Sequence, residues 1–105
     1  MSTPRFYTML GFAAKARALV SGETGCLQAI SRGKVKLVIV ARDASENTRE
    51  RFVHRCRRAG VPAVLTGTKM ELGAAMGKPE RSCIAIADSG FAKTILESLE
   101  ERVFM

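Results

Sequence analysis

Residues that commonly do chemistry are sparse in this sequence. Its single histidine, His54, lies in a segment with Arg51 and Arg55 on either side of it. A cationic neighbourhood disfavours the protonated form of an imidazole. We therefore expect His54 to be an exposed residue of a helix rather than a catalytic base.

The three cysteines, Cys26, Cys56 and Cys83, are odd in number and widely spaced. No Cys-x-x-Cys pattern occurs, so neither a disulfide framework nor a zinc site is indicated. Arg55 and Arg57 flank Cys56 and could lower the pKa of its thiol. Cys56 also belongs to an apolar stripe of its segment, which favours a buried structural role. A thiol-based enzyme or sensor remains the alternative.

Catalytic sequence motifs are missing as well. The chain has no Gly-x-Ser-x-Gly elbow, no P-loop and no His-Glu-x-x-His pattern. The sequence thus predicts a protein that is not an enzyme and that uses no cofactor and no metal.

The charge of the chain points to an anionic partner. Seventeen Lys and Arg stand against ten Asp and Glu, for a net charge of +7. Residues 1–42 hold seven of the basic side chains and one acid, Glu23, whereas residues 97–102 are mainly acidic. A protein with one strongly positive part suits a phosphate polymer. No apolar run is long enough to span a membrane, and we expect a cytoplasmic protein.

Two short segments have the composition of phosphate-binding loops. Residues 21–25 (Ser-Gly-Glu-Thr-Gly) lead into a predicted helix, whose free N–H groups and dipole favour an anion. Gln28 lies one turn further along and can pair with a base edge, while Arg32 can hold a phosphate. Residues 77–81 (Gly-Lys-Pro-Glu-Arg) form a polar loop before a buried strand, a common position for function.

These segments and their basic neighbours make up the candidate RNA-binding set. Its members are Arg17, Gly22, Glu23, Thr24, Gly25, Gln28, Arg32, Lys34, Lys78, Pro79 and Arg81. The chain has one tyrosine, five phenylalanines and no tryptophan, and most of these rings fit core positions. An aromatic platform for single strands is thus not indicated, and a folded RNA is the better partner. Five arginines at 49–58 fit a solvated helix face, with a secondary RNA contact as the alternative.

The elements that must position these residues alternate between helix and strand. Helices are predicted at about 3–17, 23–32, 45–59, 66–76 and from 88 onward, and strands at 19–20, 35–40, 63–65 and 82–87. Asn47 with Glu50 resembles a capping box for the third helix. Phe91, Ile95 and Leu99 are spaced four apart in the last one. The alternation predicts one α/β domain over residues 1–105, with a sheet between helices.

Much of the chain resembles a known family. Residues 11–45, 60–62, 72–77 and 83–87 together resemble the kink-turn RNA-binding ribosomal protein superfamily, the L-seven-Ae / L-thirty-e group. Residues 43–48 and 88–92 look most like its bacterial YlxQ branch. The resemblance implies a three-layer α-β-α sandwich with a mixed sheet of about four strands.

The same resemblance implies that structured RNA, a kink-turn or ribosomal RNA, is bound, with the ribosome as a candidate partner. Nothing in the sequence demands a dimer, and we expect a monomer. The loop entering the second helix and the loop before the last strand would hold it. This chain departs from the family pattern there, because Thr24 and Gly25 occupy the positions of a base-reading Asn and Glu. Gln28 replaces a cationic residue. A protein–protein adaptor that has lost specific RNA recognition is therefore the alternative.

Overall fold

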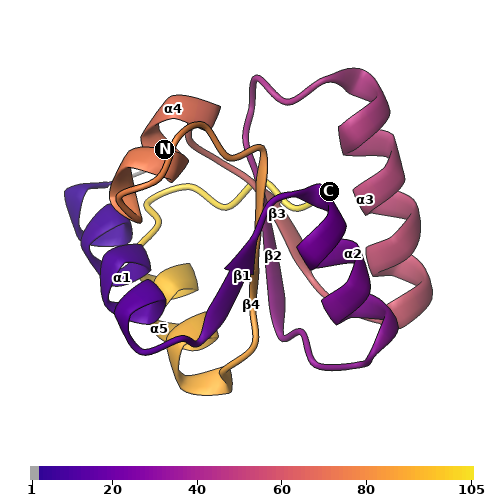
Figure 1. The fold of residues 1–105 in the computed structure, drawn as a ribbon, viewed down its shortest axis with the longest axis horizontal. Helices are drawn as coiled ribbons and strands as arrows, with labels where there is room; N and C mark the ends of the chain where they lie inside the picture. Colours follow the sequence, from indigo (N-terminus) through magenta and orange to yellow (C-terminus); the bar gives the residue numbers. More distant parts are fainter. Residues whose placement is uncertain (1–2) are drawn as a thin grey trace.

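A computed structural model of the chain describes residues 3–105 and shows a mixed four-stranded sheet between two layers of helices (Figure 1). The helices are α1 (Pro4–Lys15), α2 (Glu23–Ser31), α3 (Glu46–Ala59), α4 (Lys69–Ala75) and α5 (Ser89–Glu97). The strands are β1 (Leu19–Ser21), β2 (Leu37–Val40), β3 (Ala63–Leu65) and β4 (Cys83–Ile86). The three-layer α/β architecture predicted from the sequence is confirmed.

The sheet has the strand order β1-β4-β2-β3. β4 is antiparallel to both of its neighbours, and β2 pairs with β3 in parallel. Every residue of β2 and β4 is buried, as expected for central strands covered on both faces. We call the end of the sheet where Ser21 and Cys83 lie the loop end, and the end where Leu19 and Ile86 lie the far end.

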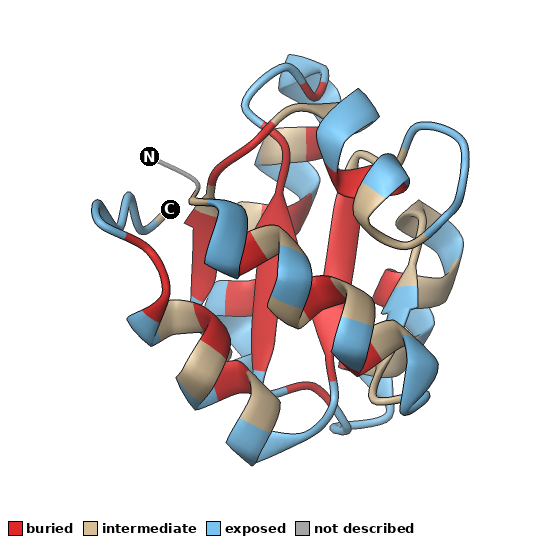
Figure 2. Ribbon diagram, turned by 90° about the vertical axis from the view of Figure 1, so that its left-hand side faces the viewer, coloured by how far each residue is buried: buried red, intermediate tan, exposed pale blue. Residues whose placement is uncertain are grey.

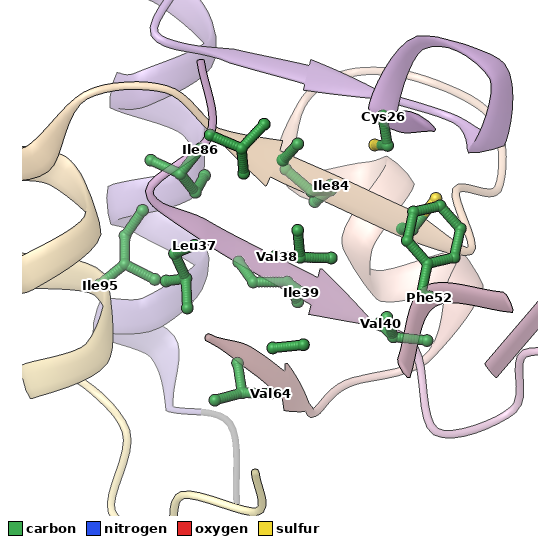
Figure 3. Close-up of a cluster of buried hydrophobic side chains, with 14 of the residues drawn as sticks. Cys26, Leu37, Val38, Ile39, Val40, Phe52, Val64, Ile84, Ile86 and Ile95 are labelled. Carbon is green, nitrogen blue, oxygen red and sulfur yellow. The ribbon is translucent and has the colours of Figure 1, made fainter. Parts of the chain in front are cut away.

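Each face of the sheet has its own helices. α2 and α3 pack side by side on one face, and α1, α4 and α5 cover the other (Figure 1). Figure 2 shows buried strands behind helices whose outer sides are exposed. Figure 3 shows Leu37 beside Ile95 of α5, and Val40 near Phe52 of α3, so β2 contributes alternate residues to two half-cores.

Side-chain burial in these half-cores is nearly complete. Each large apolar side chain removed from water stabilises the fold by about 1.5–3 kcal/mol. The largest fully buried side chains include Phe6, Leu10, Leu37, Ile39, Phe52, Leu72, Ile84, Ile86 and Ile95. Phe12 and Phe104, at 54% and 56% exposure, are the exposed aromatic residues, while Tyr7 and Phe91 are partly buried.

One helix cap differs from the predicted one, and a capping box occurs where none was predicted. The N-cap of α3 is Ser45, whose Oγ accepts a hydrogen bond from the Thr48 N–H at 3.1 Å. The capping box predicted at Asn47 was therefore wrong, because the chain enters the helix two residues earlier. The reciprocal capping box lies instead at α4, between Thr68 and its third helical residue, Glu71.

Two helices end earlier than predicted. α1 ends at Lys15, and Arg17 then adopts a left-handed backbone conformation with φ of 56°. α5 ends at Glu97, so Leu99 is buried from the segment beyond the helix. Among the helices of residues 3–105, none combines the length and the apolar character needed to cross a membrane.

Candidate nucleic-acid interface

Strand pairing brings the two predicted loops together. β1 and β4 run antiparallel, with Ser21 opposite Ile84, and the Gly22 N–H donates to the Cys83 carbonyl at 3.1 Å. β1 ends at the loop end of the sheet and β4 begins there. The start of α2 therefore lies next to the loop at residues 77–82.

Arg81 joins these two segments directly. Its Nε donates a hydrogen bond to Ser21 Oγ at 3.1 Å. Its Nη1 donates to the carbonyl oxygens of Pro79 at 3.3 Å and Glu80 at 3.0 Å. The guanidinium thus holds the loop in a tight turn against β1. Its Nη2 donates to no other residue in the described part of the chain and remains available to a ligand.

The N-terminus of α2 is open to an anion. Gly22 occupies the N-cap with φ of 88° and ψ of 154°, a conformation that side chains rarely allow, and no side chain caps the helix. Within residues 3–105, the N–H groups of Glu23, Thr24 and Gly25 have no acceptor. Free N–H groups and the positive end of the helix dipole together favour phosphate.

Glu23 has a different environment from the other loop residues. Its Oε1 accepts hydrogen bonds from Thr48 Oγ1 at 3.1 Å and from Arg51 Nη1 at 3.0 Å. Thr48 is 6% exposed, and its hydroxyl also accepts from Ser45 Oγ at 2.9 Å. The carboxylate of Glu23 is therefore engaged by the first turns of α3, and it anchors the start of α2 to that helix.

The loop at residues 77–82 depends on a glycine that the site prediction omitted. Gly73 is buried in α4, and a Cβ built on it would lie 2.0 Å from the carbonyl oxygen of Pro79. The Lys78 N–H donates to the Gly73 carbonyl at 2.9 Å, and the Arg81 backbone N–H donates to the Lys69 carbonyl at 3.0 Å. Lys78 and Pro79 are exposed on this support. A glycine in the middle of a predicted helix was the only signal of this close approach.

Three predicted cations lie away from the two loops. Arg17 precedes β1 and is therefore at the far end of the sheet, where the Ala87 N–H bonds the Ala18 carbonyl. Arg32 and Lys34 follow the last turn of α2, a helix about 13 Å long. Gln28 is exposed midway along α2. The structure thus separates Arg17, Arg32 and Lys34 from the surface formed by residues 22–25 and 77–81.

The chemistry considered for the cysteines does not fit their surroundings. All three thiols are buried and unpaired by disulfides. Burial raises the pKa of Cys56 to about 11, opposite to the direction that an activated thiol requires. His54 is exposed on α3, as predicted. In the described part of the chain, no group of three or more His, Cys, Asp or Glu is arranged to hold a metal ion.

The fold and this surface define a family, and comparison with known proteins identifies it. The pattern of the ribosomal protein L7Ae/L30e/S12e/Gadd45 family matches residues 5–96, and the chain belongs to that family. It is similar to the RNA-binding protein YlxQ of Bacillus subtilis, with 34% identity over 100 residues that cover 95% of this chain and 100% of YlxQ.

Solved structures agree with this membership. A Bacillus halodurans protein superposes with a TM-score of 0.89 and 33% identity, covering 94% of this chain and 100% of that one. The Giardia lamblia 15.5kD RNA binding protein gives a TM-score of 0.77 and 26% identity, covering 90% of this chain and 81% of its own.

Proposed function

We propose that this chain binds structured RNA and performs no reaction on it. The single observation that carries the proposal is the Arg81–Ser21 hydrogen bond, which holds a cationic loop beside an open helix N-terminus. Family membership and the names of two relatives as RNA-binding proteins support the same function. The net charge of +7 supplies a long-range attraction for a phosphate polymer.

The surface divides into a phosphate part and a base part. The N–H groups at the start of α2, the ammonium of Lys78 and the free Nη2 of Arg81 bind phosphate oxygens. Thr24 and Gln28 are exposed on the outer side of α2 and hydrogen-bond to base edges or riboses. Most of the affinity then comes from phosphates and depends strongly on salt.

The target we propose is a kink-turn or a kinked element of ribosomal RNA, bound by a cytoplasmic monomer, with the ribosome as a candidate partner. The resemblance of residues 11–45 to kink-turn binders motivates this choice. Gly25 has no side chain where the family has a base-reading residue. By analogy with DNA, a good bidentate base contact contributes about 1–3 kcal/mol. Discrimination by this chain therefore relies on RNA shape.

Titration of two RNAs tests the proposal. One is a standard kink-turn duplex, and the other is a plain duplex of equal length, each measured at two salt concentrations. We expect at least a tenfold preference for the kink-turn. Equal, salt-sensitive binding to both would leave a phosphate binder without kink-turn specificity. Absence of binding at low salt would refute the RNA function and favour the adaptor.

A pair of variants locates the surface. Lys78→Gln with Arg81→Gln removes two cations from the loop, whereas Arg5→Gln with Lys93→Gln removes two exposed cations from α1 and α5. Only the first pair should weaken RNA binding. It should also reduce the steepness with which the logarithm of the association constant falls with the logarithm of the salt concentration, by roughly 0.7–0.9 per lost phosphate contact. Equal losses in both pairs would show that net charge alone, not this surface, holds RNA.

A further inference from the structure

A row of arginines lies on the side of α3 that faces α2. Arg51, Arg55 and Arg58 follow one another at spacings of four and three residues, which places them on one face over about 10 Å. Arg51 Nη1 donates to Glu23 Oε1 at 3.0 Å, and Arg55 Nη1 donates to Ser31 Oγ at 3.3 Å. The row therefore follows the groove between the two helices, which lie side by side in Figure 1.

Most of this positive charge has no internal counter-charge. Across residues 3–105, the one ion pair within 4.0 Å is Arg51 with Glu23, and it is half exposed, at 49% and 38%. Within the same described residues, Arg55 and Arg58 pair with no carboxylate. Like charges this close repel one another, and an anionic partner outside the chain would neutralise them.

The surface around the row is hollowed. Two adjoining depressions share Arg55 and Arg58. One continues over Ser31 and Gly33 at the end of α2, and the other over the outer side of α3, where Glu50 is the one acid. Guanidinium groups in a shallow polar depression match a phosphate backbone, which they contact through paired N–H donors. The depressions offer no large apolar anchor of the kind that protein partners use.

The row is continuous with the proposed RNA surface. Both α2 and α3 start at the loop end of the sheet, because β1 and β2, which precede them, both end there. Arg51 contacts Glu23 in the first turn of α2, and Arg58 lies beside Gly33 at the other end of that helix. Arg32 and Lys34 flank Gly33 and are exposed. An RNA held at the start of α2 can thus run along the groove to a second cationic cluster.

We propose that the α2–α3 groove binds the phosphate backbone of an RNA stem that continues from the element held at the loop end. This second contact rests on the proposed function and extends the footprint across α2 onto α3. Its contacts are mainly to phosphates, because most of its lining is arginine; the two side chains that could reach a base, Asn47 and His54, line only the depression on the outer side of α3. Arg32 and Lys34, which lie far from the loops, then also contact this stem.

Two RNAs and two variants test the groove. The short RNA is the kink-turn alone, and the long RNA carries one stem extended by about ten base pairs. The groove variant is Arg55→Gln with Arg58→Gln, and the matched control is Arg5→Gln with Lys93→Gln, which has the same charge loss on the opposite layer. Thermal unfolding of each variant checks that the fold is retained.

The expected result separates the two RNAs. The groove variant should bind the short RNA within twofold of wild type and the long RNA about tenfold more weakly. Its salt slope on the long RNA should fall by roughly 1.4–1.8, for two lost phosphate contacts. The control should change both RNAs equally and by less.

Three outcomes would overturn the inference. Wild-type binding of the long RNA by the groove variant would show that α3 does not touch it. Equal losses on both RNAs would place the arginines within the short element instead. Unchanged RNA binding together with capture of a protein partner would assign the groove to that partner. If the Lys78→Gln, Arg81→Gln variant still loses binding, the proposed function stands although the inference fails. If that variant also binds normally, both fail.

Discussion

Replacing Gly73 by alanine tests how the loop at residues 77–82 is held. An added Cβ would lie 2.0 Å from the carbonyl oxygen and 2.7 Å from the carbonyl carbon of Pro79, and 2.9 Å from the carbonyl oxygen of Lys78. All three atoms belong to the backbone, so no side-chain rotation relieves the overlap. Since ordinary contacts begin near 3.4 Å, the loop must move by more than an ångström.

The energetic cost follows from that displacement. Overpacking of a closed site costs about 1–3 kcal/mol. Loss of the Lys78 N–H bond to the Gly73 carbonyl adds about 0.5–1.5 kcal/mol. Alanine regains about 0.5–1 kcal/mol over glycine within a helix. We expect a net loss of about 1–3 kcal/mol in the free energy of unfolding.

Urea unfolding followed by circular dichroism measures this loss, and Gly25→Ala is the matched control. A Cβ at Gly25 meets Val20 Cβ at 3.9 Å, an ordinary contact, so that variant should be as stable as wild type or up to about 1 kcal/mol more stable. Gly73→Ala should also weaken RNA binding, because the loop carries Lys78 and Arg81. Native stability and native RNA affinity of Gly73→Ala would refute the close approach of α4 and the loop.

Three further predictions concern the core and the junction of α2 with α3. Burial holds the pKa of Cys56 at about 11 in the folded protein, above its ordinary 9.0. The stabilisation from this thiol should therefore be full below about pH 9 and fall as pH rises toward 11. In urea titrations at several pH values, the free energy of unfolding of Cys56→Ala should fall less steeply with pH than that of wild type, and an equal slope would contradict this. Phe6→Ala should lower the free energy of unfolding by about 3–5 kcal/mol, because the Phe6 ring is fully buried. Phe12→Ala should lower it by well under about 1 kcal/mol, because the Phe12 ring is 54% exposed. Similar costs for the two variants would show that the burial pattern is wrong. Glu23→Gln removes a half-exposed ion pair and should change stability by at most about 1 kcal/mol. It should nevertheless strengthen RNA binding, because it frees Arg51 and removes one negative charge; weaker binding would mean that Glu23 itself contacts RNA.

Local sequence patterns were sufficient to predict the order and type of the elements. β2 and β4 are apolar runs that contain β-branched residues, and this composition correctly predicts buried strands. The buried stripe predicted for α3 is Phe52, Val53, Cys56 and Ala59. Phe52 and Cys56 are buried and Val53 is partly buried, but Ala59 at the end of the helix is exposed. Element ends were less predictable, because a cap depends on the direction from which the chain enters a helix. Ser45, rather than Asn47, is the N-cap residue of α3.

The candidate site could be predicted only in part. Its two loops were identified from charge and from the start of a helix, since both signals are local. The hydrogen bonds that organise them, between Arg81 and Ser21 and between Glu23 and Thr48, join residues 60 and 25 positions apart. Such contacts depend on strand order, which composition does not determine. For the same reason Arg17 could not be placed at the far end of the sheet from its sequence alone.

Amide chemical-shift mapping by NMR tests the central claim most directly. The labelled protein is titrated with the short kink-turn RNA, and shifts are followed for every backbone N–H. The account predicts that the largest changes fall at residues 22–25 and 77–81, where free N–H groups and the Arg81 guanidinium meet the RNA. Changes concentrated on α1 and α5, with residues 22–25 and 77–81 unaffected, would contradict it.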